Sequence, residues 1–536
     1  MKKNKYKTNE EALPDRHSDV LPNKIRRISA DDFPDEILGA VRLLKENGFK
    51  AYLVGGCIRD LVMGKKPFDF DITTNALPED VMSIFQNVKP TGIKHGTVTA
   101  IFSSVHAEIT TFRSEASYSD CRHPDSVIFS NRIEDDLSRR DFTINALCYN
   151  QDEGLLDLYN GIEDIENGII RSIGNAHKRF REDALRILRC LRFSATLGFE
   201  IEANTQKAMF DCSPLLKNIS YERIYSEFKK ILVSQYTKET LLQYSNVFSV
   251  VLPQIFPAEN VGNCTTDESD ATLYEKYNGP YERNDVYSGF YRSVVAASLC
   301  PPDFSIRLAA LARQDPECGT PDQVPDAAQQ RAKQALRLLK ADGKTATRTL
   351  SILKNADIHF SGDRRCIKKA LSVYGPELLS DIALLRIAEN RAYVATLEDK
   401  IRKCNDMTAF PVNDPDFKNI KGRMDEDELY LHVLDEIEDI LIKCECFSVS
   451  GLSVNGNDIL DAARVYRENV LISSHDCKVK HNSTADGGKY VSVILELLLN
   501  AVIDGRVPND KVHLCGYIRR ILDKLYALSQ YVDNNK

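Results

Sequence analysis

A pair of glycines followed by two closely spaced aspartates constrains this chain more than any other feature. The stretch Leu53–Val81 reads LVGGCIRDLVMGKKPFDFDITTNALPEDV. An apolar run ends at Gly55 and Gly56, which open a predicted helix over Cys57–Met63. Glycines at this point let backbone N–H groups approach a phosphate at the helix N-terminus, and Arg59 adds a charge-assisted contact.

The two aspartates, Asp69 and Asp71, lie in the run Phe-Asp-Phe-Asp-Ile-Thr-Thr. In a strand, alternate side chains share a face, so this run predicts both carboxylates on one face. Phe68, Phe70 and Ile72 are then expected on the opposite, buried face. Two acids at this spacing suit a pair of Mg²⁺ ions, which take hard oxygen ligands and keep positions open for phosphates. The alternative is an ordinary Asp pair in a turn, and the glycines upstream favour the metal site.

The bulk properties exclude several classes of protein. At 536 residues, with 43% hydrophobic and 28% charged residues, the chain is expected to form several globular domains. Its net charge of −8 argues against coating nucleic acid through bulk charge, so any RNA contact must come from a local basic patch. The 14 cysteines form no C-x-x-C pair, which predicts reduced thiols and a cytoplasmic location. Neither a signal peptide nor a membrane span is expected.

Further predicted elements surround the aspartates. A helix is expected over Ser29–Gly48, and His95–Phe102 and Ala107–Arg113 read as an antiparallel strand pair. On the second strand, Glu108 would stand beside the aspartate strand. A third carboxylate there could help to deprotonate an attacking hydroxyl group. The alternative is an ordinary solvated strand residue.

A polar loop over Ser114–Glu134 precedes a helix predicted over Asp135–Leu147, with acids in its first turn. Arg139, Arg140 and Asp141 cluster in that helix. Taken alone, the cluster is typical of surface ion pairs on an amphipathic helix.

A second informative stretch is the basic run between Arg171 and Arg192, which contains seven Lys or Arg residues and two acidic residues. On a helix, one face would carry Glu182, Asp183, Arg186 and Arg189. A carboxylate accepts from exocyclic amines and a guanidinium donates to ring nitrogens and carbonyls. Asp183 and Arg186 together would therefore pair with the edge of C or A and refuse G or U. A salt-bridged helix surface is the alternative.

Taken together, these motifs resemble the polymerase-β-like nucleotidyltransferases, specifically the family of class II tRNA nucleotidyltransferases (CCA-adding enzymes) and bacterial poly(A) polymerases. The resemblance implies an α+β fold: a nucleotidyltransferase head, built as a small mixed sheet with helices, followed by an all-α neck, body and tail. It implies a catalytic triad of Asp69, Asp71 and Glu108, with Mg²⁺ on the two aspartates. The nucleotide and its triphosphate are assigned to Gly55, Gly56, Arg59, Arg139, Arg140 and Asp141, and base selection to Glu182, Asp183, Arg186 and Arg189.

The family pattern also divides the chain. We expect an N-terminal extension over 1–29, the head over 30–174, the neck over 175–255, a helical body over 256–400 and a tRNA-binding tail over 401–536. In the body, Ala312–Asp315 stands where relatives carry the His-Asp of a metal phosphohydrolase pattern, so we expect a scaffold without that chemistry. Segments 260–285 and 464–487 read as insertions. In the tail, Lys489, Arg506, Lys511, Arg519 and Arg520 are candidate phosphate contacts.

The predicted function is template-independent addition of C, C and A to the 3′ end of tRNA from CTP and ATP, with release of pyrophosphate. The partners are the tRNA 3′ end, its acceptor arm and elbow, and the two nucleotides, with no membrane and no obligate protein partner evident. The resemblance makes the loop at 114–134 the family's flexible loop, whose presence favours full CCA addition. A poly(A) polymerase, an enzyme restricted to CC or to A addition, and a non-catalytic RNA-binding scaffold stay open.

Overall fold

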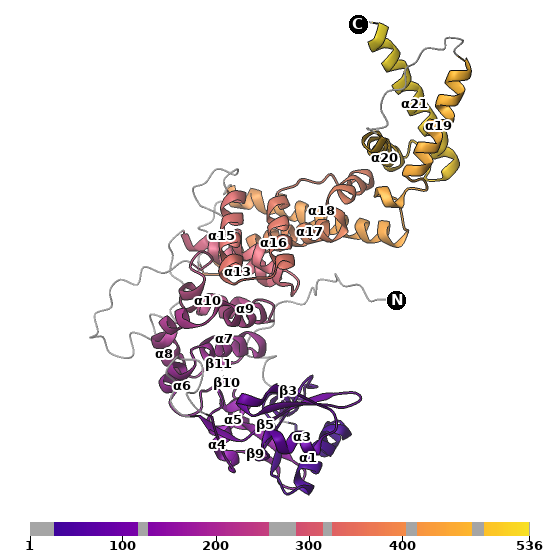
Figure 1. The fold of residues 1–536 in the computed structure, drawn as a ribbon. Helices are drawn as coiled ribbons and strands as arrows, with labels where there is room; N and C mark the ends of the chain where they lie inside the picture. Colours follow the sequence, from indigo (N-terminus) through magenta and orange to yellow (C-terminus); the bar gives the residue numbers. More distant parts are fainter. Residues whose placement is uncertain are drawn as a thin grey trace. The chain divides into compact units, whose positions relative to one another are not determined.

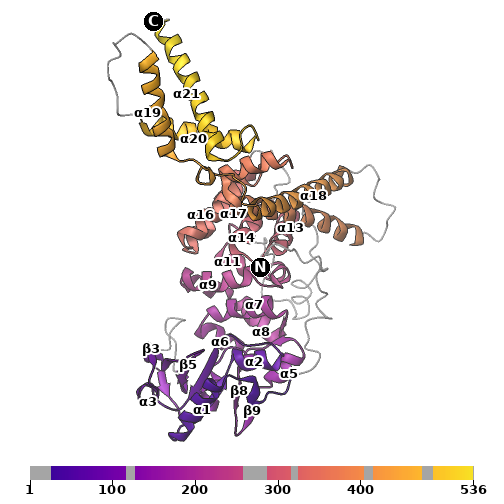
Figure 2. The same ribbon diagram turned by 90° about the vertical axis from the view of Figure 1, so that its right-hand side faces the viewer.

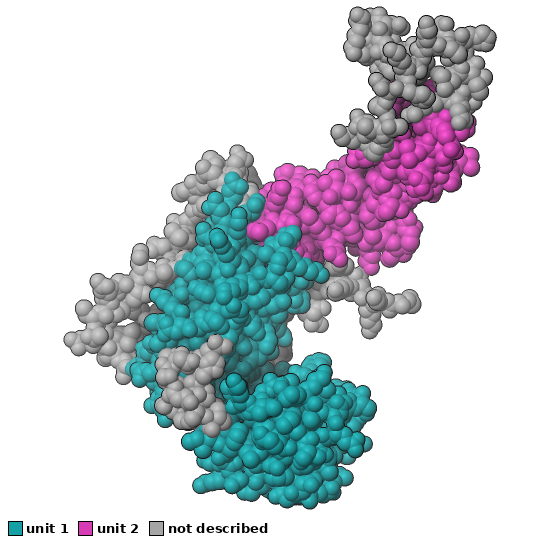
Figure 3. All heavy atoms as spheres, viewed as in Figure 1, with its two compact units in different colours: residues 1–347 teal, residues 348–536 magenta. Residues whose placement is uncertain are grey.

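The structure is a computed structural model that describes residues 26–115, 127–256, 286–314, 324–403, 415–473 and 487–534. The chain divides into two compact units, residues 1–347 and 348–536 (Figure 3). The division falls within helix α16 (Gly343–Asn355). The boundaries expected for head, neck, body and tail stay predictions.

Unit 1 begins with a seven-stranded mixed sheet in the order β3-β4-β5-β2-β1-β8-β9 (Figure 1). Its parallel pair is β2 with β5, and the other pairs within it are antiparallel. The central strand β1 is buried along its whole length, whereas β4 and β5 alternate between buried and more exposed residues. The strands are β1 (Ala51–Val54), β2 (Phe70–Thr74), β3 (Val88–Gly92), β4 (Thr97–Ile101), β5 (His106–Thr111), β8 (Leu147–Asn150) and β9 (Gly154–Asp157).

Several expected elements of the head are present. Helix α2 (Gly56–Val62) follows its predicted start closely, and α3 (Pro78–Ile84) comes after β2. The first long helix, α1, is shorter than predicted and spans Asp35–Glu46. Its start is delayed by a 3-10 turn at Ala30–Asp32 and by Pro34 at the N-cap, because proline lacks the N–H needed within a helix. The antiparallel pairing of β4 with β5 is confirmed, from Thr97 opposite Thr110 to Ile101 opposite His106.

The helix predicted over Asp135–Leu147 is wrong in extent. Helix α4 covers only Ile133–Ser138, and the chain then passes through a 3-10 turn at Thr143–Asn145 into β8. The helix stops because tertiary contacts override its pattern. Phe142, which forms a bridge with Ser172, is fully buried.

Further helices and a two-stranded parallel ladder continue unit 1 among the described residues (Figures 1 and 2). Their aromatic core centres on Phe228, which contacts Phe248, Phe256 and Phe304 edge-on. Buried aromatic side chains contribute more area per residue than aliphatic ones, so this cluster stabilises the helix packing. The helices are α6 (Ala176–Glu182), α7 (Leu185–Leu197), α8 (Ala203–Cys212), α9 (Tyr221–Leu232), α10 (Thr237–Gln243), α11 (Ser245–Val251), α13 (Val286–Leu299) and α14 (Phe304–Ala312), with α15 (Val324–Leu338) beyond. The ladder joins β10 (Ile169–Ile170) to β11 (Glu200–Ile201).

Unit 2 is helical throughout its described residues. The long helices α17 (Arg364–Lys403) and α18 (Pro415–Ile442) lie side by side, and α17 is kinked at Gly375 and Pro376 (Figure 2). Helices α19 (Gly456–Ser473), α20 (Gly487–Ile503) and α21 (Lys511–Asn534) share a separate apolar core. The α+β head followed by helical segments confirms the predicted fold class. Among the described residues, no helix is both long and apolar enough to cross a lipid bilayer.

Candidate active site

A cleft of about 580 Å³ in unit 1 brings the head and neck motifs together. Asp71 and Glu108 from the sheet line it, as do Asp183 and Arg186 from the junction of α6 and α7. Eleven of the thirteen predicted site residues line the cleft: Gly55, Gly56, Arg59, Asp71, Glu108, Arg139, Arg140, Asp141, Asp183, Arg186 and Arg189. Asp69 and Glu182 are not among its lining residues.

The acidic wall of the cleft is formed by two neighbouring strands. Asp71 on β2 lies directly opposite Glu108 on β5 in the parallel register, as the sequence predicted. Burial raises the pKa of Asp71 to about 6; Arg140 opposes the shift, and Glu108 and Asp69 reinforce it. This carboxylate therefore lies in a place where negative charge is not fully compensated.

The prediction that Asp69 and Asp71 share a strand face is wrong in part. Strand β2 begins only at Phe70, so Asp69 precedes it, in an exposed position. Phe70 and Ile72 are buried as expected, but Phe68 is 94% exposed. The chain bends at Phe68, so the strand alternation does not extend back to it.

The glycine pair allows a close approach at the floor of the cleft. Gly55 caps α2 with φ 83° and ψ −134°, a conformation that side-chain-bearing residues rarely adopt. A Cβ atom at this position would lie 3.3 Å from Arg140 Nη1 and 3.6 Å from Asp71 Oδ2. Arg59 in α2 donates to Asn145 Oδ1 at 2.7 Å and pairs with Asp60.

The segment after α4 places two arginines and a buried acid in the cleft. Arg139 and Arg140 both bind Asp136, whose side chain is fully buried. Asp141 Oδ2 accepts from Arg189 Nε at 2.8 Å and from its Nη2 at 2.5 Å. Burial alone would raise the pKa of Asp141, but Arg189 and a hydrogen bond from Asn145 outweigh it and hold the pKa at about 2. The surface ion-pair interpretation does not fit these buried contacts.

The neck motif does not lie on one continuous helix, contrary to the prediction. Helix α6 ends at Glu182, Asp183 is extended with φ −143° and ψ 103°, and α7 begins at Leu185. At the break between the helices, the side chain of Asp183 makes two contacts. Its Oδ1 accepts from the Leu185 N–H at 3.0 Å, and its carboxylate pairs with Arg223 at 2.9 Å. A continuous helix would not leave this carboxylate in place to cap α7.

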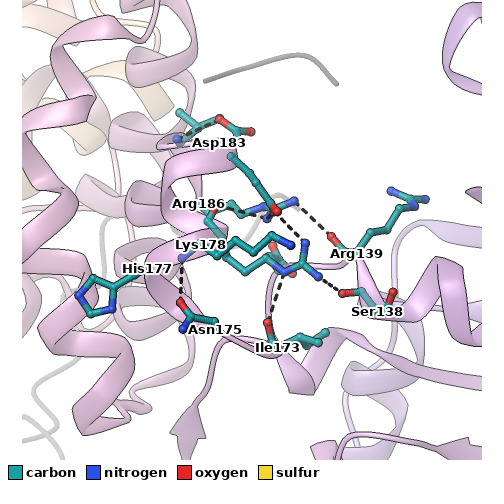
Figure 4. A network of polar contacts seen from close by, with 12 residues as sticks. Ser138, Arg139, Ile173, Asn175, His177, Lys178, Asp183 and Arg186 are labelled. Atoms are coloured by element: carbon teal, nitrogen blue, oxygen red, sulfur yellow. Dashed lines mark hydrogen bonds and ion pairs between the residues drawn. The ribbon is translucent and has the colours of Figure 1, made fainter. Parts of the chain in front are cut away.

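Arg186 is held from several sides. Its Nη1 donates to Glu182 Oε2 at 3.0 Å and its Nη2 to the Arg139 carbonyl at 3.2 Å (Figure 4). The side chain of Arg186 is 10% exposed. The guanidinium therefore enters the cleft in one defined orientation.

Sequence reasoning missed several residues of the cleft. Arg223 in α9 lines the cleft beside Asp183. The guanidinium groups of Arg192 and Arg59 lie over the ring of Phe193 in α7, with their central carbons 4.3 Å and 5.2 Å from the ring centroid. No local spacing marked Arg223 as a cleft residue or joined Phe193 to Arg59, because Asp183 and Arg59 lie far from them in sequence.

The cleft is strongly basic within an acidic chain. Its lining among the described residues includes eight arginines against four carboxylates. The whole chain has a net charge of −8, so positive charge is concentrated here. Such a cleft attracts a polyanion such as a nucleoside triphosphate.

The acids fit a divalent cation by their chemistry. Among the described residues, no group of three or more His, Cys, Asp or Glu side chains is clustered closely enough to hold a metal by itself. Mg²⁺ usually takes one or two carboxylates and completes its shell with water and substrate phosphates, so a full protein cage is not required.

Other expectations fall partly outside the described residues. The centre of the predicted flexible loop, 116–126, lies outside them, and its ends pair as β6 (Arg113–Glu115) and β7 (Val127–Phe129). Asp315 of the phosphohydrolase-like segment and the two predicted insertions, apart from parts of α19 and α20, also lie outside. In the tail, Arg519 and Arg520 are exposed, and Lys511 pairs with Asp458.

Comparison with known proteins places these features in a family context. A profile of the poly(A) polymerase head domain matches residues 51–171, and a "probable RNA and SrmB-binding site of polymerase A" matches residues 198–259. The CCA-adding enzyme of Leuconostoc mesenteroides is 50% identical over 211 residues, covering 39% of this chain and 53% of that protein. The CCA-adding enzyme of Lactobacillus helveticus is 46% identical over 215 residues, covering 40% of this chain and 54% of that protein. The matched part thus spans about half the length of these curated relatives.

The similarity extends further in three dimensions. The solved structure of the Bacillus stearothermophilus CCA-adding enzyme in complex with CTP matches with a TM-score of 0.59 and 25% sequence identity. The match covers 92% of this chain and 98% of that one.

Proposed function

We propose that the protein adds C, C and A to the 3′ end of tRNA, because residues 51–171 and 198–259 match the poly(A) polymerase head and RNA-binding profiles and because the similar proteins named above are CCA-adding enzymes. It would use CTP and ATP, release pyrophosphate and need no nucleic acid template. The observation that carries the proposal is the single cleft shared by Asp71, Glu108, Asp183 and Arg186.

The reaction is a nucleotidyl transfer. The 3′-hydroxyl oxygen of the RNA forms a bond to the α-phosphorus, and the bond from that phosphorus to the pyrophosphate oxygen breaks. Asp69 and Asp71 would hold Mg²⁺, which when bound lowers the pKa of the hydroxyl and neutralises the phosphates. Glu108, opposite Asp71 in the register, would accept the hydroxyl proton.

The remaining head residues would hold the nucleotide. The backbone at Gly55 and Gly56 and the guanidinium of Arg59 lie along the cleft, where they can bind phosphate oxygens. Arg139 and Arg140 are proposed to bind the sugar and phosphates. Asp141 belongs to the same motif, and since its Oδ2 atom binds Arg189, it would contribute by orienting that guanidinium.

Base selection is proposed for the junction of α6 and α7. Asp183 offers an acceptor to the exocyclic amine of C or A, and Arg186 offers donors to the ring nitrogen and carbonyl. Their ion pairs with Arg223 and Glu182 fix both groups before a nucleotide arrives. A rigid donor and acceptor would reject G and U, because a mismatched edge leaves buried polar groups unpaired.

The helical segments beyond the neck would bind the tRNA acceptor arm and elbow through backbone phosphates, with Arg519 and Arg520 as candidates in α21. We also propose a cytoplasmic location, where tRNA and reduced thiols occur together.

The experiment that tests this function uses a tRNA transcript ending at its discriminator base. Incubation with CTP alone should add two C residues, and later addition of ATP should add one A. Long A tails from ATP alone would instead identify a poly(A) polymerase, the alternative favoured by the name of the matched head profile. Arrest after CC, or acceptance only of a CC-ended transcript, would identify a partial enzyme. Full incorporation by Asp69→Ala would contradict the proposed chemistry and revive a non-catalytic RNA-binding scaffold.

A further inference from the structure

Arg179, in α6, connects the neck to the end of the head helix α4. Its Nη2 donates to the Ser138 carbonyl, and its Nε donates to the Ile173 carbonyl at 3.3 Å (Figure 4). Its Nη1 binds Glu182 Oε2 at 2.7 Å. Three acceptors on three different segments therefore fix one guanidinium, whose side chain is only 17% exposed.

The neighbouring arginine binds the same region of the head. Arg186 Nη2 donates to the carbonyl of Arg139, which directly follows Ser138. Two guanidinium groups from the neck thus bind two consecutive carbonyls at the C-terminal end of α4. Carbonyls at a helix end lack intrahelical partners, so cationic donors are well suited to them.

The two arginines are also joined through one carboxylate oxygen. Glu182 Oε2 accepts from Arg179 Nη1 at 2.7 Å and from Arg186 Nη1 at 3.0 Å. Arg186 Nη1 additionally reaches the backbone carbonyl of Arg179 at 3.3 Å. Arg179, Glu182 and Arg186 therefore form a closed set of contacts, and the position of Arg186 depends on the position of Arg179.

We propose that Arg179 is a positioning residue that aligns the base-selecting Arg186 with the nucleotide-binding segment at Arg139. The inference rests on the proposed function. Arg179 does not line the cleft and would touch no substrate. It acts by keeping the orientation of Arg186 fixed relative to the head, so that its donors meet the base edge while the head holds the sugar and phosphates.

Loss of Arg179 would have a specific consequence. Glu182 would keep Arg186 as a partner and Arg186 would keep the Arg139 carbonyl, but the two contacts from Arg179 to the Ser138 and Ile173 carbonyls would be lost. An orientation error of about 1 Å is enough to cost about a hundredfold in rate. We expect discrimination of CTP over UTP and of ATP over GTP to fall by about tenfold to a hundredfold, with a smaller fall in turnover of the correct nucleotide.

The test compares Arg179→Met with Arg181→Met, a matched change two residues away in the same helix. Arg181 is exposed and lies beside Cys212, away from the α4 contacts. The ratio of kcat/KM for CTP to UTP is measured on tRNA ending at the discriminator base, and that for ATP to GTP on tRNA ending in CC. Arg179→Lys, which keeps the charge and part of the hydrogen bonding, should restore part of the discrimination.

Unselective or absent incorporation by the wild-type enzyme would contradict the proposed function itself. With a selective wild type, reduced ratios in Arg179→Met and unchanged ratios in Arg181→Met support the inference. Unchanged ratios in Arg179→Met, whatever its stability, would show that Arg179 is only a structural link. If Arg179→Met does not fold, the Lys variant decides: an unchanged ratio overturns the inference and an intermediate ratio supports it.

Discussion

Asp71, which is partly exposed, and Asp141, which is buried, line the same cleft, yet the charges around them are opposite. Burial raises the pKa of Asp71 to about 6, with Glu108 and Asp69 adding to the effect, whereas Arg189 and Asn145 hold the pKa of Asp141 at about 2 against burial. Nearby positive charge does not compensate the carboxylate of Asp71, whereas Arg189 compensates the carboxylate of Asp141. Asp71 therefore keeps an uncompensated charge beside Glu108, where we propose the cation, whereas the ion pair of Asp141 with Arg189 is already formed in the protein alone.

The largest effect is expected from Asp71→Asn, which removes the charge from the acidic wall. Nucleotide incorporation should fall by about a thousandfold or more, because this carboxylate is proposed to hold the cation that stabilises the transferring phosphate. Single-turnover addition of labelled CTP to tRNA measures the loss. Asp152→Asn, which changes an exposed acid of the head, is the control and should retain full activity. Comparable losses in both variants would contradict a special role for Asp71.

The second prediction concerns the opposite carboxylate. Asp141→Asn should destabilise unit 1 by about 2 to 3 kcal/mol, because it breaks a buried ion pair, with the partial exposure of Arg189 reducing the cost. The folded pKa of Asp141 lies below its usual value of 3.8, so its contribution is present above that pH and is lost as the pH falls towards 2. Urea unfolding of the variant and the wild type between the pH of that usual value and pH 2 measures this contribution to stability. If the free energy of unfolding of the variant stayed below that of the wild type at pH 2, the ion pair would not explain the difference.

Packing behind the cleft gives the third prediction. A Cβ atom on Gly161 would lie 2.4 Å from the Thr143 carbonyl oxygen, so Gly161→Ala must move α5 (Gly161–Glu166) away from the segment that carries Asp141. We expect a loss of about 1 to 3 kcal/mol in the free energy of unfolding. Gly39 in α1 has no atom within 4 Å of its Cβ position, so Gly39→Ala should instead stabilise by about 0.5 to 1 kcal/mol. Equal effects of the two changes would contradict the close contact.

The last prediction is the stability change of Asp71→Asn, whose sign is opposite to that of Asp141→Asn. The folded pKa of Asp71 lies above the usual value of 3.8, so the folded state binds the extra proton and is destabilised as the pH rises through about 6. At pH 7 without divalent cations, Asp71→Asn should be more stable than wild type by about 1 to 3 kcal/mol. The gain should disappear below about pH 4. A variant less stable than wild type at pH 7 would show that the charge of Asp71 is already compensated.

The sequence predicted the elements whose signals are local. Strands β4 and β5 and the glycine turn before α2 followed from alternation and spacing, and Glu108 lies beside the aspartate strand as expected. The helix over 135–147 failed because Phe142 is drawn into the core and forms a bridge with Ser172. Such tertiary contacts override a helical pattern, and the local sequence does not reveal them.

The neck shows the same limit more sharply. Helical spacing placed Glu182 and Arg186 four residues apart on one face, and they do form an ion pair. The break at Asp183 was not predicted, since it depends on Arg223, forty residues further along the chain. The sequence therefore predicted most of the residues that line the cleft. It did not predict the ion pair with Arg223 that orients Asp183.

The most direct test of the account compares Asp71→Asn with Arg186→Met by sequencing the 3′ ends of tRNA after incubation with all four nucleotides. We expect Asp71→Asn to leave the ends without additions, and Arg186→Met still to extend them but to insert U and G among the added residues. If Arg186→Met added only C and A with the fidelity of the wild type, the proposed division between chemistry in the head and base selection in the neck would be wrong.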